Sequence, residues 1–241
     1  MQFTQQVKFW QRFRQMPLVG ICRNLALSDL LHILPIYKAA GLQNIEITMN
    51  TPGAAGIIKT LVKEFGSAIN IGAGTVCSEG DLDLALIAGA TFIVTPIVNE
   101  KVIRGCRSAE TPVFAGAFTP TEIFKAWSYG ADVVKLFPSS AISMGFFRDL
   151  RGPFPQIPLL PTGGVNLDNC VEFIGYGAAG VGIGSNLFPK AMLATGNRVA
   201  LQKHFEAYAA RITVAMASGS ATVAGLRPAY SNHALTSTDH K

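Results

Sequence analysis

Two patterns of apolar and polar positions recur eight times along the chain. Short runs rich in β-branched and other apolar residues predict buried strands, and each is followed by a stretch with helical spacing. The strand candidates are residues 17–22, 44–50, 70–76, 91–97, 112–118, 132–138, 158–164 and 180–187. The helix candidates are residues 28–40, 53–65, 79–89, 99–109, 120–129, 143–151, 167–175 and 197–216.

This alternation predicts an α/β fold with one parallel sheet. Parallel strands need crossover connections, and a helix between two strands supplies a right-handed one. Eight units of similar length over residues 17–216 suit a closed (β/α)8 TIM barrel. A doubly wound open sheet is the alternative fold.

Both ends of the chain lie outside the eightfold pattern. Apolar residues recur at helical spacing near the start of the chain: Phe3, Val7, Trp10 and Phe13. They predict an N-terminal amphipathic helix over residues 1–16 whose apolar face covers the bottom of the barrel, with a helix on a membrane surface as the alternative. Residues 217–241 are rich in Ser, Ala, Thr and Gly without apolar periodicity, and we expect a flexible C-terminal tail there.

Capping residues mark several of the helix boundaries. Ser28, Ser78 and Thr119 stand before helix candidates and belong to the residue types that cap helix N-termini. Thr119 is followed by Pro120, which suits the first helical position. Glycines end four of the candidates, at positions 41, 89, 130 and 177.

Composition narrows the class of protein. The chain has 241 residues, of which 49% are hydrophobic and 15% charged, and this composition suits a packed domain rather than a disordered chain. The net charge of +5 is not arranged as a basic stripe interleaved with aromatic residues. No apolar run approaches the roughly 18–20 residues that span a bilayer, and no signal-peptide pattern opens the chain. We therefore expect a cytoplasmic protein that binds neither nucleic acid nor membrane.

Cysteine and histidine spacing does not suggest a metal site. The four cysteines are widely separated without a Cys-x-x-Cys pair, and the four histidines lack metal-ligand spacing. We expect reduced thiols, no metal and no cofactor.

A lone lysine in the sixth strand candidate is the strongest chemical signal. Lys135 stands in the apolar run DVVKLFP, residues 132–138. Burial disfavours the charged ammonium, lowers the pKa and makes the neutral amine available to attack a ketone and form a Schiff base. The alternative is a lysine at a strand end whose ammonium reaches solvent or a carboxylate.

A glutamate in the second strand candidate is its natural partner. Because side chains alternate across a strand, Glu46, Thr48 and Asn50 share one face, as Val133, Lys135 and Phe137 do on the sixth. If these faces point inward, a carboxyl and an amine enter one cavity from different strands. A structural Glu–Lys ion pair is the alternative.

Glycine-rich ends on the last two strand candidates predict a phosphate site. PTGGV (161–165) ends the seventh candidate and GIGSN (182–186) ends the eighth. Loops after these strands often bind phosphate in barrels, since glycine lets backbone N–H groups converge on an anion.

These segments together resemble one family. In order, IEIT (45–48), GAGTV (72–76), FIVTP (92–96), KLFP (135–138), PTGG (161–164) and GS (184–185) are similar to motifs of the 2-keto-3-deoxy-6-phosphogluconate (KDPG) and 4-hydroxy-2-oxoglutarate (KHG) aldolase family. The resemblance runs from about residue 17 to about residue 210. It implies a pyruvate-dependent class I aldolase without metal or cofactor, assembled as a homotrimer.

The resemblance also implies roles for single residues. Lys135 would form the Schiff base, and Glu46 would be the general acid and base. The predicted substrate-binding residues are Arg23, Asn50, Thr75, Pro96, Phe137 and Thr162. The predicted phosphate-binding residues are Gly163, Gly164, Gly184 and Ser185.

One position departs from the gluconate-type pattern. Asn50 stands where those enzymes usually carry an arginine that helps bind the substrate carboxylate, and the 2-oxo-3-deoxygalactonate 6-phosphate aldolases are similar to this chain there. Asparagine offers hydrogen bonds but no charge, and Arg23 is the candidate for the missing cation. The sugar epimer therefore stays open.

The resemblance implies cleavage of KDPG or its galactonate epimer to pyruvate and glyceraldehyde 3-phosphate. A 4-hydroxy-2-oxoglutarate aldolase that yields pyruvate and glyoxylate is the first alternative. A catalytically silent barrel that binds a phosphate ligand is the second.

Overall fold

The computed structural model describes residues 2–217, with side chains from residue 5 onward. The tail predicted at residues 217–241 lies outside the described residues from position 218. Residue 217 itself is the last residue of a helix.

Eight parallel strands form a ring, as the alternation predicted. They are β1 (Leu18–Cys22), β2 (Asn44–Thr48), β3 (Asn70–Gly74), β4 (Ile93–Val94), β5 (Val113–Ala117), β6 (Val133–Leu136), β7 (Leu159–Pro161) and β8 (Val181–Ile183). Consecutive strands pair from β1 to β7, and β8 pairs with β1. A parallel bridge between Thr162 and Gly182 joins β7 to β8. The open doubly wound sheet is therefore excluded.

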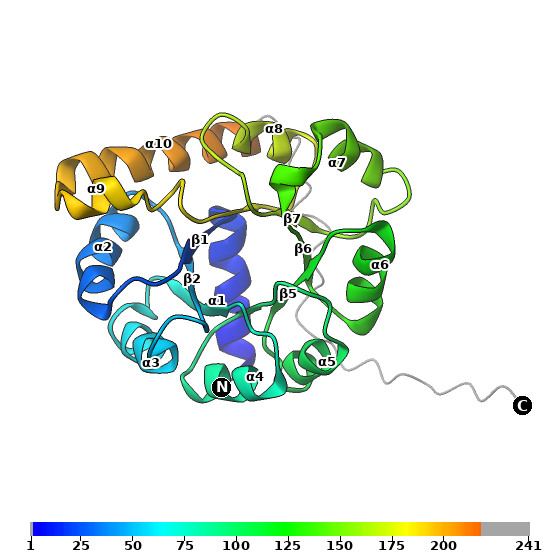
Figure 1. Ribbon diagram of the computed structural model, residues 1–241, viewed down its shortest axis with the longest axis horizontal. Coiled ribbons are helices and arrows are strands. Elements are labelled where there is room, and N and C mark those ends of the chain that lie inside the picture. Colours follow the sequence, from blue (N-terminus) through cyan, green and yellow to red (C-terminus); the bar gives the residue numbers. More distant parts are fainter. Residues whose placement is uncertain (1, 218–241) are drawn as a thin grey trace, which may run out of the picture.

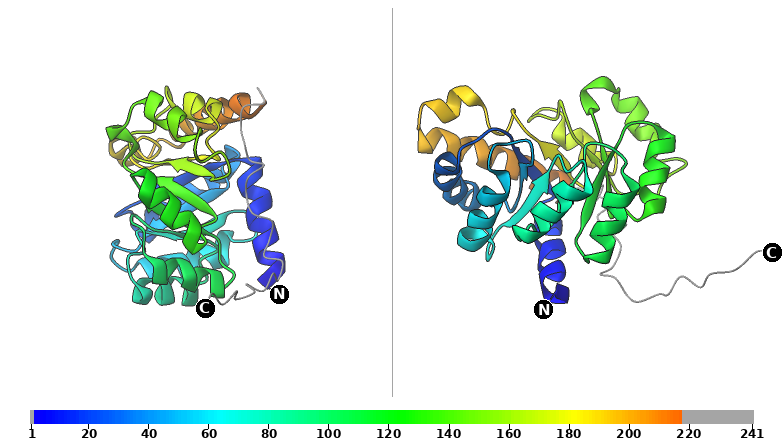
Figure 2. Two further views of the ribbon diagram at one scale, coloured as in Figure 1. Left: turned by 90° about the vertical axis from the view of Figure 1, so that its right-hand side faces the viewer. Right: turned by 60° about the horizontal axis from the view of Figure 1, so that its bottom comes forward.

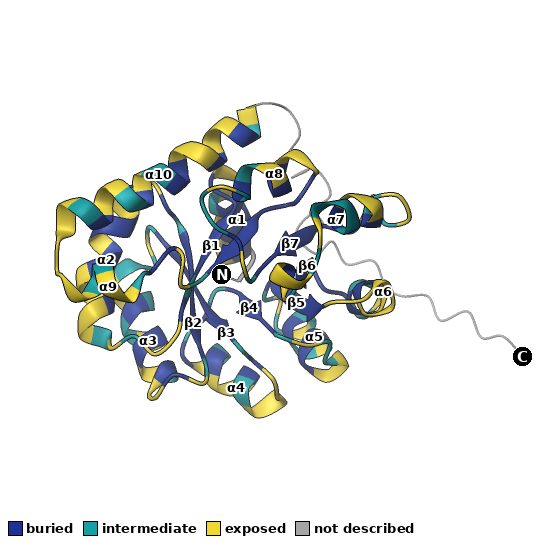
Figure 3. Cartoon of the chain, turned by 45° about the horizontal axis from the view of Figure 1, so that its top comes forward, coloured by how far each residue is buried: buried dark blue, intermediate teal, exposed yellow. Residues whose placement is uncertain are grey.

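Helices surround this ring, except for α1, which lies across one end of it (Figure 1), and the surrounding helices expose their outer faces to solvent (Figure 3). They are α1 (Gln2–Gln15), α2 (Leu27–Ala39), α3 (Ala54–Phe65), α4 (Glu79–Ile87), α5 (Glu100–Ser108), α6 (Pro120–Tyr129), α7 (Met144–Leu150), α8 (Cys170–Gly175), α9 (Lys190–Ala194) and α10 (Arg198–Ala217). The short helix α9 and the 3-10 turn Ser139–Ala141 were not predicted. No helix within residues 2–217 is long and apolar enough to cross a membrane.

Every predicted strand was longer than the observed one, and the difference is largest for three of them. The structure reduces 91–97 to β4, 158–164 to β7 and 180–187 to β8. The seventh ends early because Gly163 and Gly164 adopt left-handed φ angles of +85° and +76°, which no strand uses. The eighth ends early because Leu187 N–H donates to the Gly184 carbonyl and closes a turn.

Capping was predicted correctly at two of the three serine and threonine positions. Ser78 and Thr119 each form a capping box, with Asp81 and Glu122 respectively. The prediction for Ser28 was wrong, since α2 begins at Leu27 and no side chain caps it. All four predicted glycine ends have positive φ angles.

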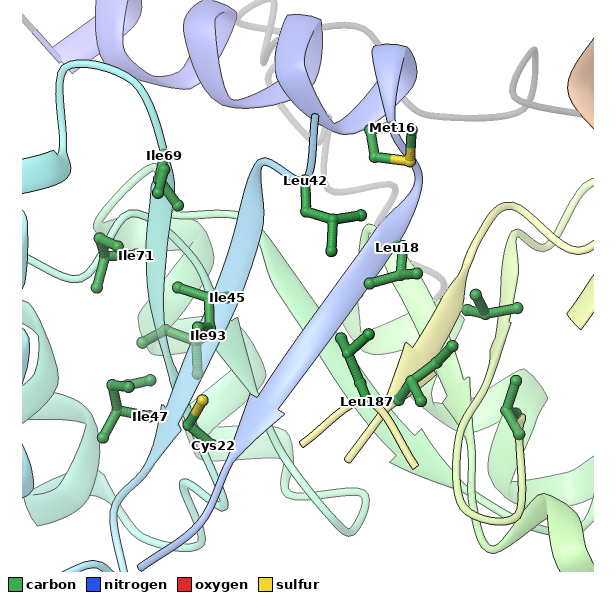
Figure 4. Close-up of a cluster of buried hydrophobic side chains, with 14 of the residues drawn as sticks. Met16, Leu18, Cys22, Leu42, Ile45, Ile47, Ile69, Ile71, Ile93 and Leu187 are labelled. Atoms are coloured by element: carbon green, nitrogen blue, oxygen red, sulfur yellow. The ribbon is translucent and has the colours of Figure 1, made fainter. Parts of the chain in front are cut away.

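Strand side chains divide into an outer and an inner apolar layer. The outer layer faces the helices, and Figure 4 shows Leu18, Ile45, Ile47 and Ile71 in it. The inner layer fills the barrel with Val19, Phe92, Val94, Phe114, Val133 and Leu160. Asn44, Glu46 and Thr48 alternate with Ile45 and Ile47 on β2, so they face inward.

Helix α1 closes the bottom of the barrel, and in Figure 2 it lies along one side of the molecule. Phe9, Trp10 and Phe13 are buried in one cluster with Phe92 and Phe114. The Phe9 and Phe92 rings are 5.2 Å apart, as are those of Phe13 and Phe114. The predicted N-terminal helix is confirmed, and because its apolar face is used inside the protein, the membrane-surface alternative is not supported.

Among the described side chains, the predicted apolar face of α1 was wrong in one position, and the Phe3 side chain lies outside the described residues. Val7 is 44% exposed, whereas Phe9, which the spacing argument left out, is fully buried. The buried face is therefore rotated toward the aromatic residues, because those bury the most apolar area against the barrel.

Buried amides join α1 to the strands. Asn70 donates from Nδ2 to the Phe9 carbonyl (3.0 Å) and to Asn44 Oδ1 (2.8 Å). Asn44 donates to the Met16 carbonyl at 2.7 Å. Arg12 donates to Asn70 Oδ1 at 3.2 Å and to the carbonyls of the α3–β3 turn. Asn44 and Asn70 therefore have hydrogen-bond partners for their buried amides and carry no penalty of an unsatisfied polar group. The side-chain oxygen of Gln43, next to Asn44, has no such partner.

Candidate active site

A cavity of about 400 Å³ opens at the C-terminal ends of the strands. Barrel enzymes place their active sites at this end. The lining residues come mainly from the ends of β1, β6, β7 and β8 and from the loops that follow them. They are Ile21, Arg23, Asn24, Leu25, Lys135, Phe137, Thr162, Gly163, Gly164, Val165, Gly182, Gly184, Ser185, Asn186, Phe188 and Lys190.

Lys135 lies on β6, and its side chain lines this cavity. Strand β6 is buried along its whole length and paired on both sides, so only the end of the side chain reaches the cavity, and the residue is 5% exposed. Its Nζ lies 5.0 Å from the centre of the Phe137 ring. Burial lowers the pKa of Lys135 and the positive charge of Arg23 lowers it further, while Glu46 and Cys77 oppose both. The amine is therefore biased toward its neutral, nucleophilic form.

Glu46 lies deeper in the barrel and is 1% exposed. Burial raises the pKa of its carboxyl group, against the opposing effect of Lys135 and Arg23. A carboxyl held nearer neutrality exchanges protons more readily at working pH. Position 74 must be glycine for this arrangement, because a Cβ there would collide with the Glu46 carboxyl group.

The two groups do not form a structural ion pair. The ion pairs among the described residues are Lys101–Glu79, Arg104–Glu100 and Arg148–Asp149, all on the surface. Glu46 and Lys135 sense each other's charge, yet no hydrogen bond joins them to each other or to another described side chain. Two buried ionisable groups are thus left without a direct protein partner, as expected where a ligand completes the site.

Side-chain amides hold the two glycine-rich loops in place. Asn169 donates to the Gly164 carbonyl at 3.1 Å, and Asn186 donates to the Val165 carbonyl at 2.8 Å. Among the described residues, no acceptor is found for the backbone N–H groups of Gly164 and Ser185. The carbonyls of Gly164 and Val165 therefore accept hydrogen bonds from the protein, while the N–H groups of Gly164 and Ser185 are available to solvent or an anion.

Ser139 supports the wall next to Lys135, and the sequence did not single it out. Its hydroxyl donates to the Leu136 carbonyl (2.8 Å) and accepts from the Thr162 N–H (3.1 Å), so it ties β6 to β7. Position 182 on β8 must be glycine, because a Cβ there would collide with the Thr162 hydroxyl. In the sequence Ser139 is only a serine directly after KLFP, and its burial becomes evident in the structure.

Two threonine hydroxyl groups position the loop that carries Arg23. Thr51 accepts from the Asn24 N–H at 3.0 Å, and its hydroxyl lies 3.1 Å from that of Thr48 on β2. Asn24 adopts a left-handed φ of 55°, a conformation that Asn tolerates better than most residues. The first loop is thereby fixed to the end of the strand that carries Glu46.

The predicted site residues divide into two groups. Arg23, Lys135, Phe137, Thr162 and the four glycine-loop residues named above line the cavity. Glu46 lies behind them, and Asn50, Thr75 and Pro96 are not among the lining residues. Asn50 is exposed past the end of β2, whereas Thr75 and Pro96 are half-buried. Asn24, Asn186 and Lys190 line the cavity and were not predicted.

Comparison with known proteins agrees with this geometry. The family model "KDPG and KHG aldolase" matches residues 10–204. The chain belongs to this family. It is 34% identical over 180 residues to the 2-dehydro-3-deoxy-6-phosphogalactonate aldolase of Escherichia coli K12, covering 74% of this chain and 87% of that protein. It is 33% identical over 186 residues to a 2-dehydro-3-deoxy-phosphogluconate aldolase of Pseudomonas aeruginosa, covering 76% and 82%.

A solved structure of the KDPG and KHG aldolase family superposes on most of the chain. The KDPG aldolase of Legionella pneumophila, with pyruvate captured as a covalent carbinolamine, matches with a TM-score of 0.77 and 27% identity. The match covers 83% of this chain and 97% of that one. Family membership therefore rests on both sequence and fold.

Proposed function

We propose that this protein is a class I aldolase that cleaves a 2-keto-3-deoxy-6-phospho-sugar acid, KDPG or its galactonate epimer. The products would be pyruvate and glyceraldehyde 3-phosphate. One observation carries the proposal: Lys135 is buried with a lowered pKa, has no ion-pair partner among the described residues, and lines a cavity at the top of the barrel. That is the environment in which a lysine acts as a nucleophile.

The reaction begins at the ketone. Neutral Lys135 Nζ attacks C2 of the substrate to give a carbinolamine, and loss of water gives a protonated imine. Glu46 supplies and removes protons during these steps, through a water molecule where the carboxyl group does not reach the substrate. Its burial and raised pKa support this role.

Carbon–carbon cleavage follows from the imine. As the base removes the proton of the C4 hydroxyl, the electrons of the C3–C4 bond move into the imine and the aldehyde leaves. The remaining enamine is protonated at C3 and hydrolysed, which releases pyruvate and regenerates Lys135. The imine is the electron sink, so the reaction as written uses no metal or cofactor.

The cavity walls support the assignment of substrate groups. Arg23 is a cation near Lys135 and Glu46, which suits the substrate carboxylate in place of the arginine that Asn50 replaces. Phe137 and Thr162 line the cavity together with Lys135, which supports their assignment to the walls around the reacting carbon. The Gly164 and Ser185 N–H groups suit the phosphate. Asn50, Thr75 and Pro96 are not among the lining residues, so the proposal gives them no contact with the substrate. The homotrimer stays a prediction of the family resemblance, and the cytoplasmic location stays a prediction of the sequence.

A turnover assay on several substrates tests the proposal. Pyruvate release would be followed with KDPG, its galactonate epimer, unphosphorylated 2-keto-3-deoxygluconate and 4-hydroxy-2-oxoglutarate. We expect the highest kcat/KM with one of the two phosphorylated epimers. A preference for 4-hydroxy-2-oxoglutarate would replace the proposal by the glyoxylate-forming aldolase, and binding without any turnover would replace it by a silent phosphate-binding barrel.

A further inference from the structure

The cavity has one cation that the proposed chemistry does not use. Its positively charged lining residues are Arg23, Lys135 and Lys190, and none of the described residues in its wall is Asp or Glu. A pocket lined by charges of one sign concentrates ligands of the opposite sign. The substrate class carries two anionic groups, a carboxylate beside the ketone and a phosphate at the far end.

Arg23 and Lys190 line the cavity from different segments. Arg23 follows β1 and affects the pKa of both Glu46 and Lys135, so we assign it to the reacting end of the cavity. Lys190 is the first residue of α9, so it reaches the cavity from the segment after β8 that also carries Ser185.

Buried residues fix the chain that leads to Lys190. It follows Ser185 by five positions, and Leu187 and Phe188 between them are buried. The Phe188 ring lies 6.0 Å from Tyr37 and 5.7 Å from Phe205, centre to centre. Because this short connection is anchored, Lys190 stays near the glycine loop that presents the Ser185 N–H group.

The ammonium of Lys190 is free to meet a ligand. It forms no ion pair with a described residue, and its residue is exposed. The same is true of Lys59, which lies on α3 and does not line the cavity. Lys59 therefore provides a control of equal charge.

We propose that Lys190 is a specificity-determining residue, whose ammonium pairs with the dianionic phosphate at the distal end of the substrate. This inference rests on the proposed function and adds a selective residue to it. A dianion held by two backbone N–H groups and one ammonium is better satisfied than by the N–H groups alone. When the substrate lacks the phosphate, the Lys190 ammonium stays hydrated and contributes nothing to substrate binding.

Lys190→Gln, Lys190→Arg and Lys59→Gln test the inference in the full chain. The kcat/KM would be measured for the preferred phosphorylated substrate and for the unphosphorylated sugar acid of the same stereochemistry, which differs only by the phosphate. In Lys190→Gln the ratio of the two values should fall about ten-fold, the size of one charge-assisted hydrogen bond, through KM rather than kcat. Lys190→Arg should restore most of the ratio, and Lys59→Gln should keep it.

Binding of inorganic phosphate, followed by calorimetry, gives a readout independent of turnover. Lys190→Gln should weaken it by a similar factor, while Lys59→Gln should not. Equal losses on both substrates, or an unchanged ratio and unchanged phosphate affinity, would overturn the role of Lys190. If the native protein turns over neither substrate, the proposed function fails, and the phosphate titration alone decides the inference.

Discussion

Asn44 and Glu46 lie two residues apart on the same inward face of β2, yet the protein treats them in opposite ways. The Asn44 amide donates to two backbone carbonyls and accepts from Asn70, so its polar atoms are satisfied at the bottom of the barrel. Glu46 is equally buried but has no hydrogen bond to a described residue. The amides at the bottom therefore support the fold, whereas the Glu46 carboxyl group at the top is left for a ligand.

The same contrast holds between whole ends of the barrel. Five aromatic rings and satisfied amides close the bottom. Two buried ionisable groups and two glycine-rich loops form the top. Unpaired buried charges cost stability, so the bottom should be sensitive in folding assays and the top in kinetic ones.

Removing the amine at the top should have the largest kinetic effect. Lys135→Ala should abolish pyruvate release, because the mechanism forms its imine on the buried Lys135 amine. Its melting temperature should equal or exceed that of the native protein, since a costly buried amine is removed. A coupled pyruvate assay and a thermal melt measure both properties, with Lys59→Ala as the control. Near-native turnover in Lys135→Ala would contradict the mechanism.

Removing the carboxyl group should have the next largest effect. Glu46→Gln keeps the shape of the side chain but cannot exchange protons. We expect turnover to slow by about 10²–10⁴, the usual contribution of general acid–base catalysis. Steady-state kinetics at saturating substrate measures the loss. An unchanged kcat would show that another group or solvent transfers the protons.

A change at the bottom should affect stability instead. Phe13→Ala removes a fully buried ring that contacts Phe9, Trp10 and Phe114. We expect a loss of about 3–5 kcal/mol in the free energy of unfolding, the range for such truncations. Urea denaturation measures it, and kcat below the melting temperature should stay near native. A large fall in kcat of the folded variant would mean that the two ends are coupled.

The smallest effect concerns the pH dependence of the amine. Arg23 lowers the pKa of Lys135, so Arg23→Gln should raise that pKa and move the onset of imine formation to higher pH. Glu46 raises the pKa of Lys135, so Glu46→Gln should move the onset to lower pH. The rate of cyanoborohydride reduction with pyruvate, measured across pH, reports both. Shifts in the same direction would show that the charges around Lys135 are misassigned.

The alternation of β2 and β6 was enough to predict the central pair from the sequence. Lys135 and Glu46 are polar residues in apolar runs, and a strand period of two fixes which neighbours share their face. The closed ring followed from eight units of similar length. These features are local or periodic, so one sequence reveals them.

The remaining features depend on contacts between distant segments. Phe9 replaced Val7 on the buried face of α1 because the barrel interior offered it Phe92 and Phe114. Ser139 and Lys190 follow predicted elements without any pattern of their own, and only the assembled loops bring them to the cavity wall. The early ends of β7 and β8 reflect glycine φ angles and a turn, which an apolar run conceals.

Covalent trapping with pyruvate tests the central claim most directly. The native protein would be incubated with pyruvate and borohydride, digested, and its peptides mapped by mass spectrometry. The account predicts one reduced pyruvyl adduct, on the peptide that contains Lys135, and none in Lys135→Ala. A folded protein that binds pyruvate without an adduct, or that carries the adduct on another lysine, would contradict it.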